Sequence, residues 1–157
     1  MEIGVGLDAT LGLSYEAQAE VCREAARLGY TSIWTNEGAA EDGFQVCSFR
    51  WLATRDVVPE GLTTGISVSP VALRTPFGLS MSAGTLGKMT GGRFILGIGT
   101  GAAYTPEGRR QFGLRERSSL ALMRAYLTTM RGLLAGDSVT YESKAVTLRG
   151  VRLGITR

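Results

Sequence analysis

The sequence predicts an α/β fold in which parallel β-strands alternate with α-helices. Short runs rich in apolar and β-branched residues occupy 2–7, 31–35, 62–68 and 93–98, and a segment with helical spacing of apolar residues follows each run. Strands connected through helices in this way run parallel and are joined by right-handed crossovers. The chain of 157 residues, 44% of them hydrophobic and 20% charged, suits one globular domain with a buried core.

Each of the first three predicted helices has an apolar face, and the first and third have recognisable end signals. Ser14 is placed to cap the first helix and Gly29 to stop it, while Thr75 and Pro76 have the order typical of a cap followed by the first helical residue. The predicted apolar faces comprise Val21, Ala25 and Leu28 in the first helix, Phe44, Cys47 and Trp51 in the second, and Leu79, Ala83 and Leu86 in the third.

The fourth strand leads into a long polar loop before the clearest amphipathic pattern in the chain. That pattern predicts a helix that begins near Ser118 and ends at Gly136. Residues 139–141 and 145–148 then predict a small β-hairpin near the C-terminus. The apolar face predicted for the helix comprises Leu120, Met123, Leu127, Met130 and Leu134, and the methionines fit core packing.

The composition excludes several kinds of site. The chain has no histidine, which removes Ser-His-Asp and Cys-His nucleophile pairs, histidine bases and histidine metal ligands. Cys22 and Cys47 have no redox or metal spacing, so we expect buried free thiols. The net charge of +3 is small and scattered, and we expect no nucleic-acid partner. The one basic cluster, interrupted by acids, fits a solvated loop as well as an anion-attracting surface; it consists of Arg109, Arg110, Arg115 and Arg117, with Glu107 and Glu116 between and beside them.

The sequence predicts no membrane association. No apolar run approaches the ~18 residues that a membrane-spanning helix needs. The start of the chain, Met-Glu-Ile-Gly-Val-Gly-Leu-Asp, lacks the basic region of a signal peptide. We therefore expect a cytoplasmic protein.

Three alternating glycines end the fourth strand. The segment 91–101 reads Gly-Gly-Arg-Phe-Ile-Leu-Gly-Ile-Gly-Thr-Gly, and backbone amides next to Gly97, Gly99 and Gly101 are suited to holding a phosphate. Glycines at the exit of a strand also serve tight turns. The spacing matches neither the dinucleotide fingerprint nor a P-loop, which disfavours an open nucleotide-binding sheet of the Rossmann type.

A polar residue follows or ends each predicted strand: Asp8, Glu37, Ser69 and Thr100. The carboxyl ends of parallel strands meet at one edge, where open α/β sheets and (β/α)8 barrels both place their ligands. Any one of these residues would also fit a helix cap or a turn. Together they predict a site.

Four segments carry a family resemblance: 29–37, 65–70 with 74–76, 91–101 and 147–153. In this order they resemble the luciferase-like flavin-dependent oxidoreductases, which include enzymes that use the deazaflavin coenzyme F420. The resemblance implies the first half of a TIM (β/α)8 barrel. It also implies hydride transfer or monooxygenation of a small organic substrate, with F420 as the preferred cofactor and FMN as the alternative.

Carried over to this sequence, the resemblance places Glu37 near the cofactor ring and makes Ser69 and Ser67 cofactor-binding residues. It also implies a non-proline cis peptide bond within Ile66-Ser67-Val68. The phosphate-bearing tail is assigned to Gly99, Thr100, Gly101 and Thr105.

Two positions depart from the pattern of the sugar-phosphate dehydrogenase branch of that family. Gly38 and Ala102 stand where that branch has a histidine and a glutamate, so its proton-relay pair is missing. The remaining candidates for a general acid or base are Glu37, which we favour, Asp8 and Tyr104, besides water and the substrate.

Length limits the expected activity. A complete barrel takes about 250 residues and eight βα units, whereas 1–157 supplies four, so we expect a single luciferase-like domain truncated after the fourth unit. Such a chain should bind flavin poorly by itself. Its open strand edges would favour homo-oligomers. The alternative interpretation is a non-catalytic half-barrel that works as an interaction or assembly module.

Overall fold

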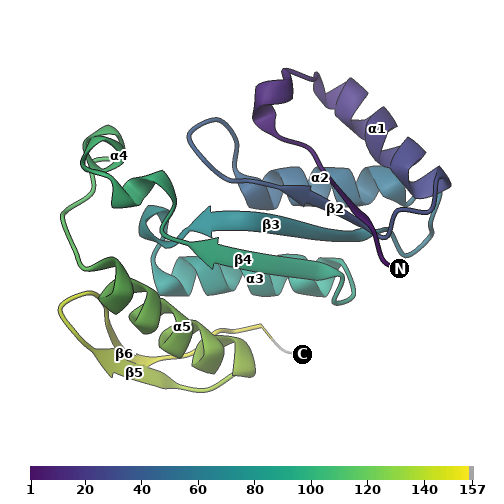
Figure 1. The fold of residues 1–157 in the computed structure, drawn as a ribbon. Coiled ribbons are helices and arrows are strands. Elements are labelled where there is room, and N and C mark those ends of the chain that lie inside the picture. Colours follow the sequence, from purple (N-terminus) through teal and green to yellow (C-terminus); the bar gives the residue numbers. More distant parts are fainter. Residues whose placement is uncertain (156–157) are drawn as a thin grey trace. The chain divides into compact units, whose positions relative to one another are not determined.

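The computed structural model describes residues 1–155, apart from the side chains of Ala102 and Ala103 (Figure 1). The last two residues of the predicted domain, 156 and 157, lie outside the described residues. Two compact units are present. The first unit contains Met1–Ser69 and Leu86–Ile98, and the second contains Pro70–Thr85 and the chain from Gly99 onward.

The predicted parallel sheet is confirmed. It consists of β1 (Gly4–Gly6), β2 (Ser32–Thr35), β3 (Thr63–Pro70) and β4 (Phe94–Gly99), in that spatial order. β1 and β2 pair in parallel with Val5 opposite Ile33, and β2 and β3 with Trp34 opposite Gly65. The arrows of β3 and β4 point the same way in Figure 1. Each strand lies within two residues of its predicted range.

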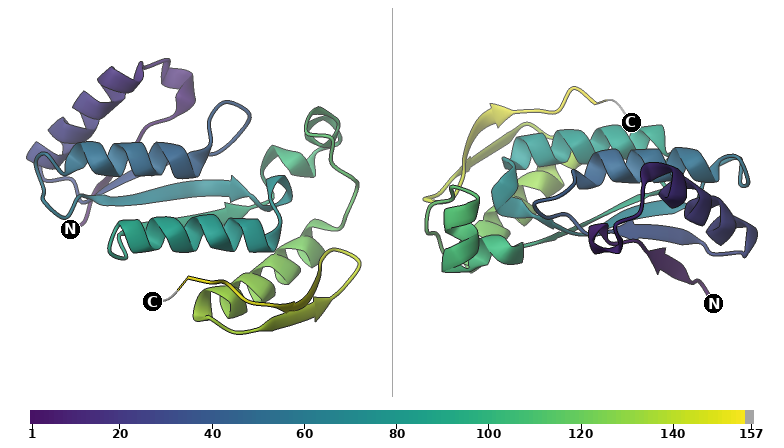
Figure 2. Two further views of the ribbon diagram at one scale, coloured as in Figure 1. Left: turned by 180° about the vertical axis from the view of Figure 1, so that it is seen from behind. Right: turned by 90° about the horizontal axis from the view of Figure 1, so that it is seen from above.

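Two helices of the first unit pack against each other, α1 (Tyr15–Arg27) and α2 (Gly43–Thr54). They lie on the same side of the strands (Figure 2), as right-handed crossovers require. The predicted cap of α1 is present, since the Ser14 hydroxyl accepts a hydrogen bond from the Ala17 amide at 3.2 Å. Asp42 caps α2 in the same way.

The predicted apolar face is correct for α2 and wrong for part of α1. Phe44, Cys47 and Trp51 are all buried. In α1, however, Val21 is 37% exposed and Leu28 68% exposed. The buried side is formed by small residues, Ala19, Cys22, Ala25 and Ala26, because only small side chains let α1 approach its neighbours closely.

α3 (Pro76–Met89) follows the short 3₁₀ turn η2 (Val71–Leu73). Its predicted N-terminal cap and apolar face are confirmed. The Thr75 hydroxyl accepts a hydrogen bond from the Gly78 amide at 3.1 Å, and Leu79, Ala83 and Leu86 are buried.

The polar segment after β4 is more ordered than predicted. It contains the 3₁₀ turn η3 (Gly101–Tyr104) and the short helix α4 (Pro106–Gln111). Thr105 caps α4 by accepting from the Gly108 amide at 3.0 Å, and Pro106 is the first helical residue. Thr105-Pro106 repeats the Thr75-Pro76 signal, so the sequence held the information for this helix.

α5 (Ser119–Ala135) has the predicted ends, but of its predicted apolar face only Met130 is buried. Gly136 adopts a left-handed φ of 89° as its C-terminal stop. Leu120, Leu127 and Leu134 are 70%, 49% and 42% exposed. The buried residues are Ala125, Tyr126, Thr129, Met130 and Leu133. The helix is turned this way because it packs on η2 and β5, and because the Tyr126 hydroxyl donates to the Arg74 carbonyl.

The predicted hairpin is present as β5 (Val139–Glu142) and β6 (Thr147–Val151), an antiparallel pair. Cys22 and Cys47 are free and buried, as predicted. Burial raises the pKa of each of these thiols to about 11. None of the helices within the described residues combines the length and the apolar character that crossing a bilayer requires.

A buried arginine connects four elements of the first unit. Arg50 on α2 is 1% exposed. Its guanidinium donates to the Gln18 side-chain oxygen on α1 at 2.8 and 3.1 Å, and to the Leu7 carbonyl just after β1 at 3.0 Å. A longer bond of 3.4 Å reaches the Trp34 carbonyl of β2. Burial lowers the pKa of Arg50, but an arginine stays protonated in proteins.

We predict that Arg50→Met destabilises the chain by about 2–4 kcal/mol, because the buried Gln18 and Leu7 oxygens lose their donors. The measurement is the free energy of unfolding in urea. Arg27→Ala is the control, since Arg27 forms exposed ion pairs with Glu20 and Glu24 and should cost at most about 1 kcal/mol. Equal losses in both variants would contradict the role given to Arg50.

Candidate functional site

Three of the predicted site residues gather at one edge of the first unit. Asp8 lies two residues after β1, Glu37 two residues after β2, and Ser69 within the last two residues of β3. Because these strands are parallel, their carboxyl ends share an edge. Thr100 directly follows β4 along the chain and belongs to the second unit.

Glu37 and Ser69 form a buried pair. Glu37 is 7% exposed and Ser69 is fully buried. One carboxylate oxygen of Glu37 accepts from the Ser69 hydroxyl, and the other accepts from the Gly43 amide at 3.0 Å. Gly43 is the first residue of α2, where the helix dipole favours a negative charge. Both carboxylate oxygens of Glu37 therefore accept hydrogen bonds. These bonds connect the chain just after β2 to β3 and to the start of α2.

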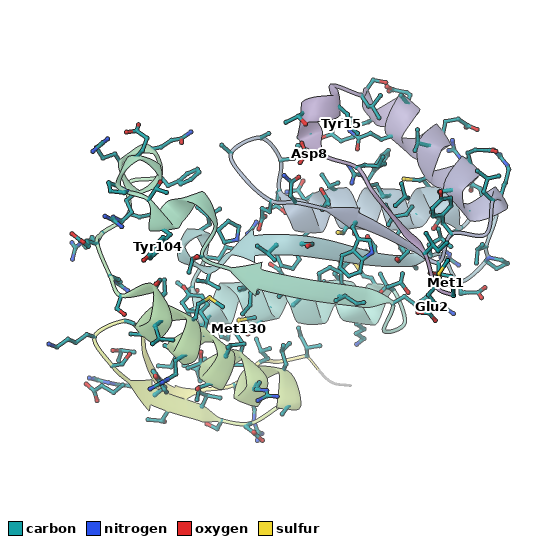
Figure 3. All side chains as sticks on the ribbon, viewed as in Figure 1. Met1, Glu2, Asp8, Tyr15, Tyr104 and Met130 are labelled. Atoms are coloured by element: carbon teal, nitrogen blue, oxygen red, sulfur yellow. The ribbon has the colours of Figure 1, made fainter. Side chains whose placement is uncertain are left out.

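Asp8 is occupied by a local cap. Its carboxylate accepts from the Thr10 amide at 2.7 Å and begins the 3₁₀ turn η1 (Ala9–Leu11); Figure 3 labels Asp8 at this turn. The hydrogen bonds with Thr10 lower the pKa of Asp8, with a smaller contribution from Asn36. Asp8 is therefore ionised at neutral pH, which makes it a poor proton donor.

The cis peptide bond implied by the resemblance is confirmed between Ser67 and Val68. Ser67 is exposed and Val68 is 37% exposed, so this stretch of β3 presents its surface beside the buried pair. The Glu37 amide donates to the Val68 carbonyl at 3.4 Å. The cis bond, Ser67 and the Glu37–Ser69 pair therefore lie next to one another at the carboxyl end of β3.

Different structural constraints explain the presence of glycine at two positions within 91–101. A Cβ on Gly97 would lie 2.6 Å from the Ile66 carbonyl oxygen, so only glycine permits β4 to pass this part of β3. Gly101 has a φ of 56°, and a Cβ there would lie 2.8 Å from Pro70. Of the three alternating glycines, Gly101 alone has a positive φ. Close approach therefore explains Gly97, and backbone conformation explains Gly101.

The second unit contains a pocket of about 300 Å³. Thr100 contributes to its wall from the end of β4, Tyr104 from η3 and Tyr126 from α5; Figure 3 labels Tyr104. Burial raises the pKa of Tyr126, which remains a neutral phenol. Three arginines complete the polar part of the wall: Arg109, Arg115 and Arg117.

These arginines give the pocket a positive wall. Arg109 has a side chain only 20% exposed; it donates to the Tyr104 carbonyl at 2.8 Å and lies 3.8 Å from the Glu116 carboxylate. Arg117 donates to the Ala145 carbonyl. Such fixed guanidinium groups suit a phosphate. From the sequence, this basic cluster fits a solvated loop as well as an anion-attracting surface. The pocket favours the second interpretation.

The predicted residues thus fall into two groups. Asp8, Glu37, Ser67 and Ser69 belong to the first unit, and Gly99, Thr100, Gly101 and Thr105 to the second. Thr100 lines the pocket, whereas Thr105 caps α4 and is not among the described lining residues. Tyr126 was missed because the helical pattern of α5 favoured a face that excludes it.

The described residues include no group of three or more acidic or cysteine side chains placed to hold a metal ion. Oxygen and nitrogen donors that could hold an organic anion are present instead, in the arginine-lined pocket.

Comparison with known proteins agrees with this fold. The family model for luciferase-like monooxygenases matches residues 1–155. A Mycobacterium tuberculosis protein described as a candidate coenzyme F420-dependent oxidoreductase is 32% identical over 143 residues, which cover 88% of this chain and 39% of that protein.

Two solved structures have the same fold. The F420-dependent tetrahydromethanopterin reductase of Methanopyrus kandleri matches with a TM-score of 0.79 and 18% identity, over 98% of this chain and 46% of that one. The oxygenating constituent of 3,6-diketocamphane monooxygenase from Pseudomonas putida, in complex with FMN, matches with a TM-score of 0.77 and 19% identity, over 94% of this chain and 43% of that one.

The fold and the polar carboxyl edge define this chain as an α/β protein of the TIM-barrel class, represented by four βα units. The chain belongs to the luciferase-like monooxygenase family. It spans less than half the length of the relatives named above.

We predict that Ser69→Ala lowers the free energy of unfolding by about 1–3 kcal/mol, because the buried Glu37 carboxylate loses a donor. Ser67→Ala is a matched control two residues earlier on β3. Ser67 is exposed, so its loss should change stability by no more than about 0.5 kcal/mol. Chemical denaturation of both variants measures the difference, and an unchanged Ser69→Ala protein would show that the pair does not stabilise the fold.

Proposed function

We propose that this chain provides the cofactor-binding part of an F420- or FMN-dependent oxidoreductase that acts on a small organic substrate by hydride transfer or monooxygenation. Membership of the luciferase-like family supports the proposal. The descriptions of the M. tuberculosis and M. kandleri proteins name F420, and the P. putida structure contains FMN. The two free, buried cysteines agree with a reducing cytoplasmic location as part of this proposal.

The arginine-lined pocket is the observation that carries the proposal. F420 and FMN each consist of a tricyclic ring, a deazaflavin or a flavin, attached to a phosphate-bearing tail. A pocket of about 300 Å³ that contains Thr100 and three arginines fits a phosphate and its neighbouring atoms. Gly99 and Gly101 flank Thr100 and leave the backbone accessible for the same anion. We assign the phosphate to Thr100 and Arg109, with Thr105 at the margin of this site.

Taken by itself, the first unit offers the surface of β3 as the candidate contact for the ring. Ser67 and Val68 are exposed there, whereas Ser69 is fully buried with its hydroxyl donated to Glu37. Ser67 is therefore better placed to touch a cofactor, and Ser69 and Glu37 support this surface from beneath. When bound, a flavin or deazaflavin supplies the hydride-accepting and hydride-donating carbon or nitrogen. In this proposal Ser67 and the backbone of β3 orient the ring.

F420 is the preferred cofactor in this proposal. The M. tuberculosis relative, which has the higher sequence identity of the three proteins compared, is described in terms of F420. FMN remains the alternative because the P. putida structure binds it with the same fold. The family's later strands belong to the complete pocket as well, so a second half supplied in trans should be needed for tight binding and turnover.

We predict that Arg109→Ala weakens the binding of FMN and F420 by about 10- to 100-fold, because a charge-assisted contact to the phosphate is lost. Riboflavin has the same ring as FMN but lacks the phosphate. It should bind equally well to the unmodified chain and to the Arg109→Ala variant. The measurement is fluorescence titration of the chain, alone and co-expressed with the second half of a luciferase-like relative.

Arg110→Ala is the matched control for this titration. Arg110 neighbours Arg109 in sequence, pairs with Glu107 on α4, and is not among the described residues that line the pocket. Its removal should leave all three affinities unchanged. If neither FMN nor F420 binds even after complementation, the proposed function is wrong. If Arg109→Ala and Arg110→Ala weaken binding equally, the phosphate does not bind specifically at Arg109.

We predict that Glu37→Gln in the complemented enzyme lowers kcat by less than about tenfold and leaves the pH profile in place, because both carboxylate oxygens are committed to Gly43 and Ser69. Steady-state kinetics between pH 5 and 9 measure both quantities. A loss of about 100-fold or more together with a lost ionisation would instead make Glu37 the general acid or base. Asp8→Asn serves as the comparison at the same sheet edge.

A second candidate function is assembly without catalysis. The open sheet favours it, since β1 and β4 each pair on one side only within the described sheet. Ile95 on β4 is 47% exposed, and exposed strand edges promote association. In this case the chain forms homo-oligomers or joins a partner that completes the sheet. A chain that elutes as a stable monomer in gel filtration and captures no second half would contradict it.

A further inference from the structure

The leucines of α5 that do not reach the core lie on one regular face of the helix. Leu120, Leu127 and Leu134 recur every seven residues and are 70%, 49% and 42% exposed. Arg124 and Arg131 lie between them in sequence and are also exposed. Residues three, four and seven apart share one side of an α-helix. These five residues are called the leucine–arginine face.

The opposite side of α5 is held by the second unit. α5 contacts η2 and β5, and the β5–β6 hairpin runs along one side of it in Figures 1 and 2. The Tyr126 hydroxyl donates to the Arg74 carbonyl. The residues that α5 buries are Ala125, Tyr126, Thr129, Met130 and Leu133. Turning the leucines inward would break these contacts, so the rotation of α5 keeps the leucine–arginine face outside.

The spacing of this face is that of a coiled-coil core. In a two-stranded coiled coil, the residues that meet the partner helix alternate at intervals of four and three. The leucine–arginine face has these intervals from 120 to 134, with leucine at three successive d positions and arginine at the two a positions between them. It extends over about 20 Å of helix. This pattern predicts packing against a second helix.

The charge of the face disfavours a second copy of α5 as that helix. The sequence of α5 contains two arginines and no acidic residue. Within residues 1–155, Arg124 and Arg131 form no ion pair with a carboxylate, whereas the exposed Arg23 and Arg27 of α1 both pair with Glu20. Two α5 helices joined through this face would bring four guanidinium groups together without a carboxylate from either helix. Juxtaposed like charges select against such a pairing.

We propose that the leucine–arginine face binds an amphipathic helix of another protein, one that presents aliphatic side chains to the leucines and carboxylates to Arg124 and Arg131. Burial of the leucines supplies the attraction. The arginine stems cover apolar surface while their guanidinium groups reach the carboxylates, which selects the partner. None of the five residues is among the described residues that line the arginine-lined pocket. The surface is therefore independent of the proposed cofactor.

The test uses a synthetic peptide of three heptads with leucine at every d position and glutamate at every a position, and with alanine and glutamine elsewhere. The labelled peptide is titrated into the 157-residue chain and followed by fluorescence anisotropy. A matched peptide has lysine in place of glutamate. We expect saturable binding of the glutamate peptide, at least about tenfold tighter than that of the lysine peptide at low salt. Equal affinities, or no saturable binding, would overturn the proposal.

Reversing the charge of the face should reverse the preference. Arg124→Glu with Arg131→Glu should bind the lysine peptide more tightly than the glutamate peptide. The control is Lys88→Glu with Arg152→Glu, which changes the net charge equally at two exposed positions outside the face. This control should retain the preference for glutamate. A reversal in the control as well would reduce the effect to net charge and refute a local site.

The leucines are tested separately. Leu120→Ser with Leu127→Ser should weaken binding of the glutamate peptide by about tenfold or more. Leu134 is left unchanged because it also approaches α3, where a Cβ on Gly84 would lie 3.8 Å from its Cδ2. Leu52→Ser on α2, at a leucine that is 51% exposed, is the control and should bind normally. Circular dichroism checks that each variant is folded, and unchanged binding in the double leucine variant would contradict the proposal.

Two further measurements identify other occupants of the face. A homodimer in gel filtration that Leu127→Ser dissociates would assign the face to a second copy and overturn the acidic partner. Loss of peptide binding after addition of the second half of a luciferase-like relative would assign the face to that half, with the same consequence. Peptide binding that persists in the complemented protein supports the proposal, whether or not a flavin binds.

Discussion

The first unit depends on the buried guanidinium of Arg50. Three backbone or side-chain oxygens, from Leu7, Gln18 and Trp34, accept its hydrogen bonds. A buried cation is costly unless its donors are satisfied, so the position of α2 is tied to α1 and to the carboxyl ends of β1 and β2. Asp8 and Glu37 follow these strand ends. The constraint that fixes the core therefore also fixes the backbone at the candidate site.

The same edge contains a second constraint, the Glu37–Ser69 pair. Glu37 bridges Ser69 on β3 and the first amide of α2, and its own amide bonds to Val68. Polar groups that look catalytic in a sequence are here satisfied by one another. The neighbouring Ser67–Val68 segment is exposed.

The second unit contains the arginine-lined pocket. Its arginines lie on the segments around α4 and the start of α5, where the sequence fits a solvated loop as well as an anion-attracting surface. Thr105 and Pro106 order this region by beginning α4, and Arg109 bonds to Tyr104 within it. The result is a wall of guanidinium groups whose positions are set by the backbone.

Sequence alone determined the order of strands and helices, the caps at Ser14 and Thr75, the hairpin and the polar residues at the strand ends, because these features depend on local propensity and periodicity. It could not determine which side of α1 and α5 is buried, since that is decided by neighbouring elements: small residues let α1 approach α2, and the Tyr126 hydroxyl turns α5 toward Arg74. Nor could it reveal that Glu37 and Ser69 bond to each other, or that Thr100 shares a pocket with Tyr126. Those contacts join residues distant in sequence, and only tertiary packing brings them together.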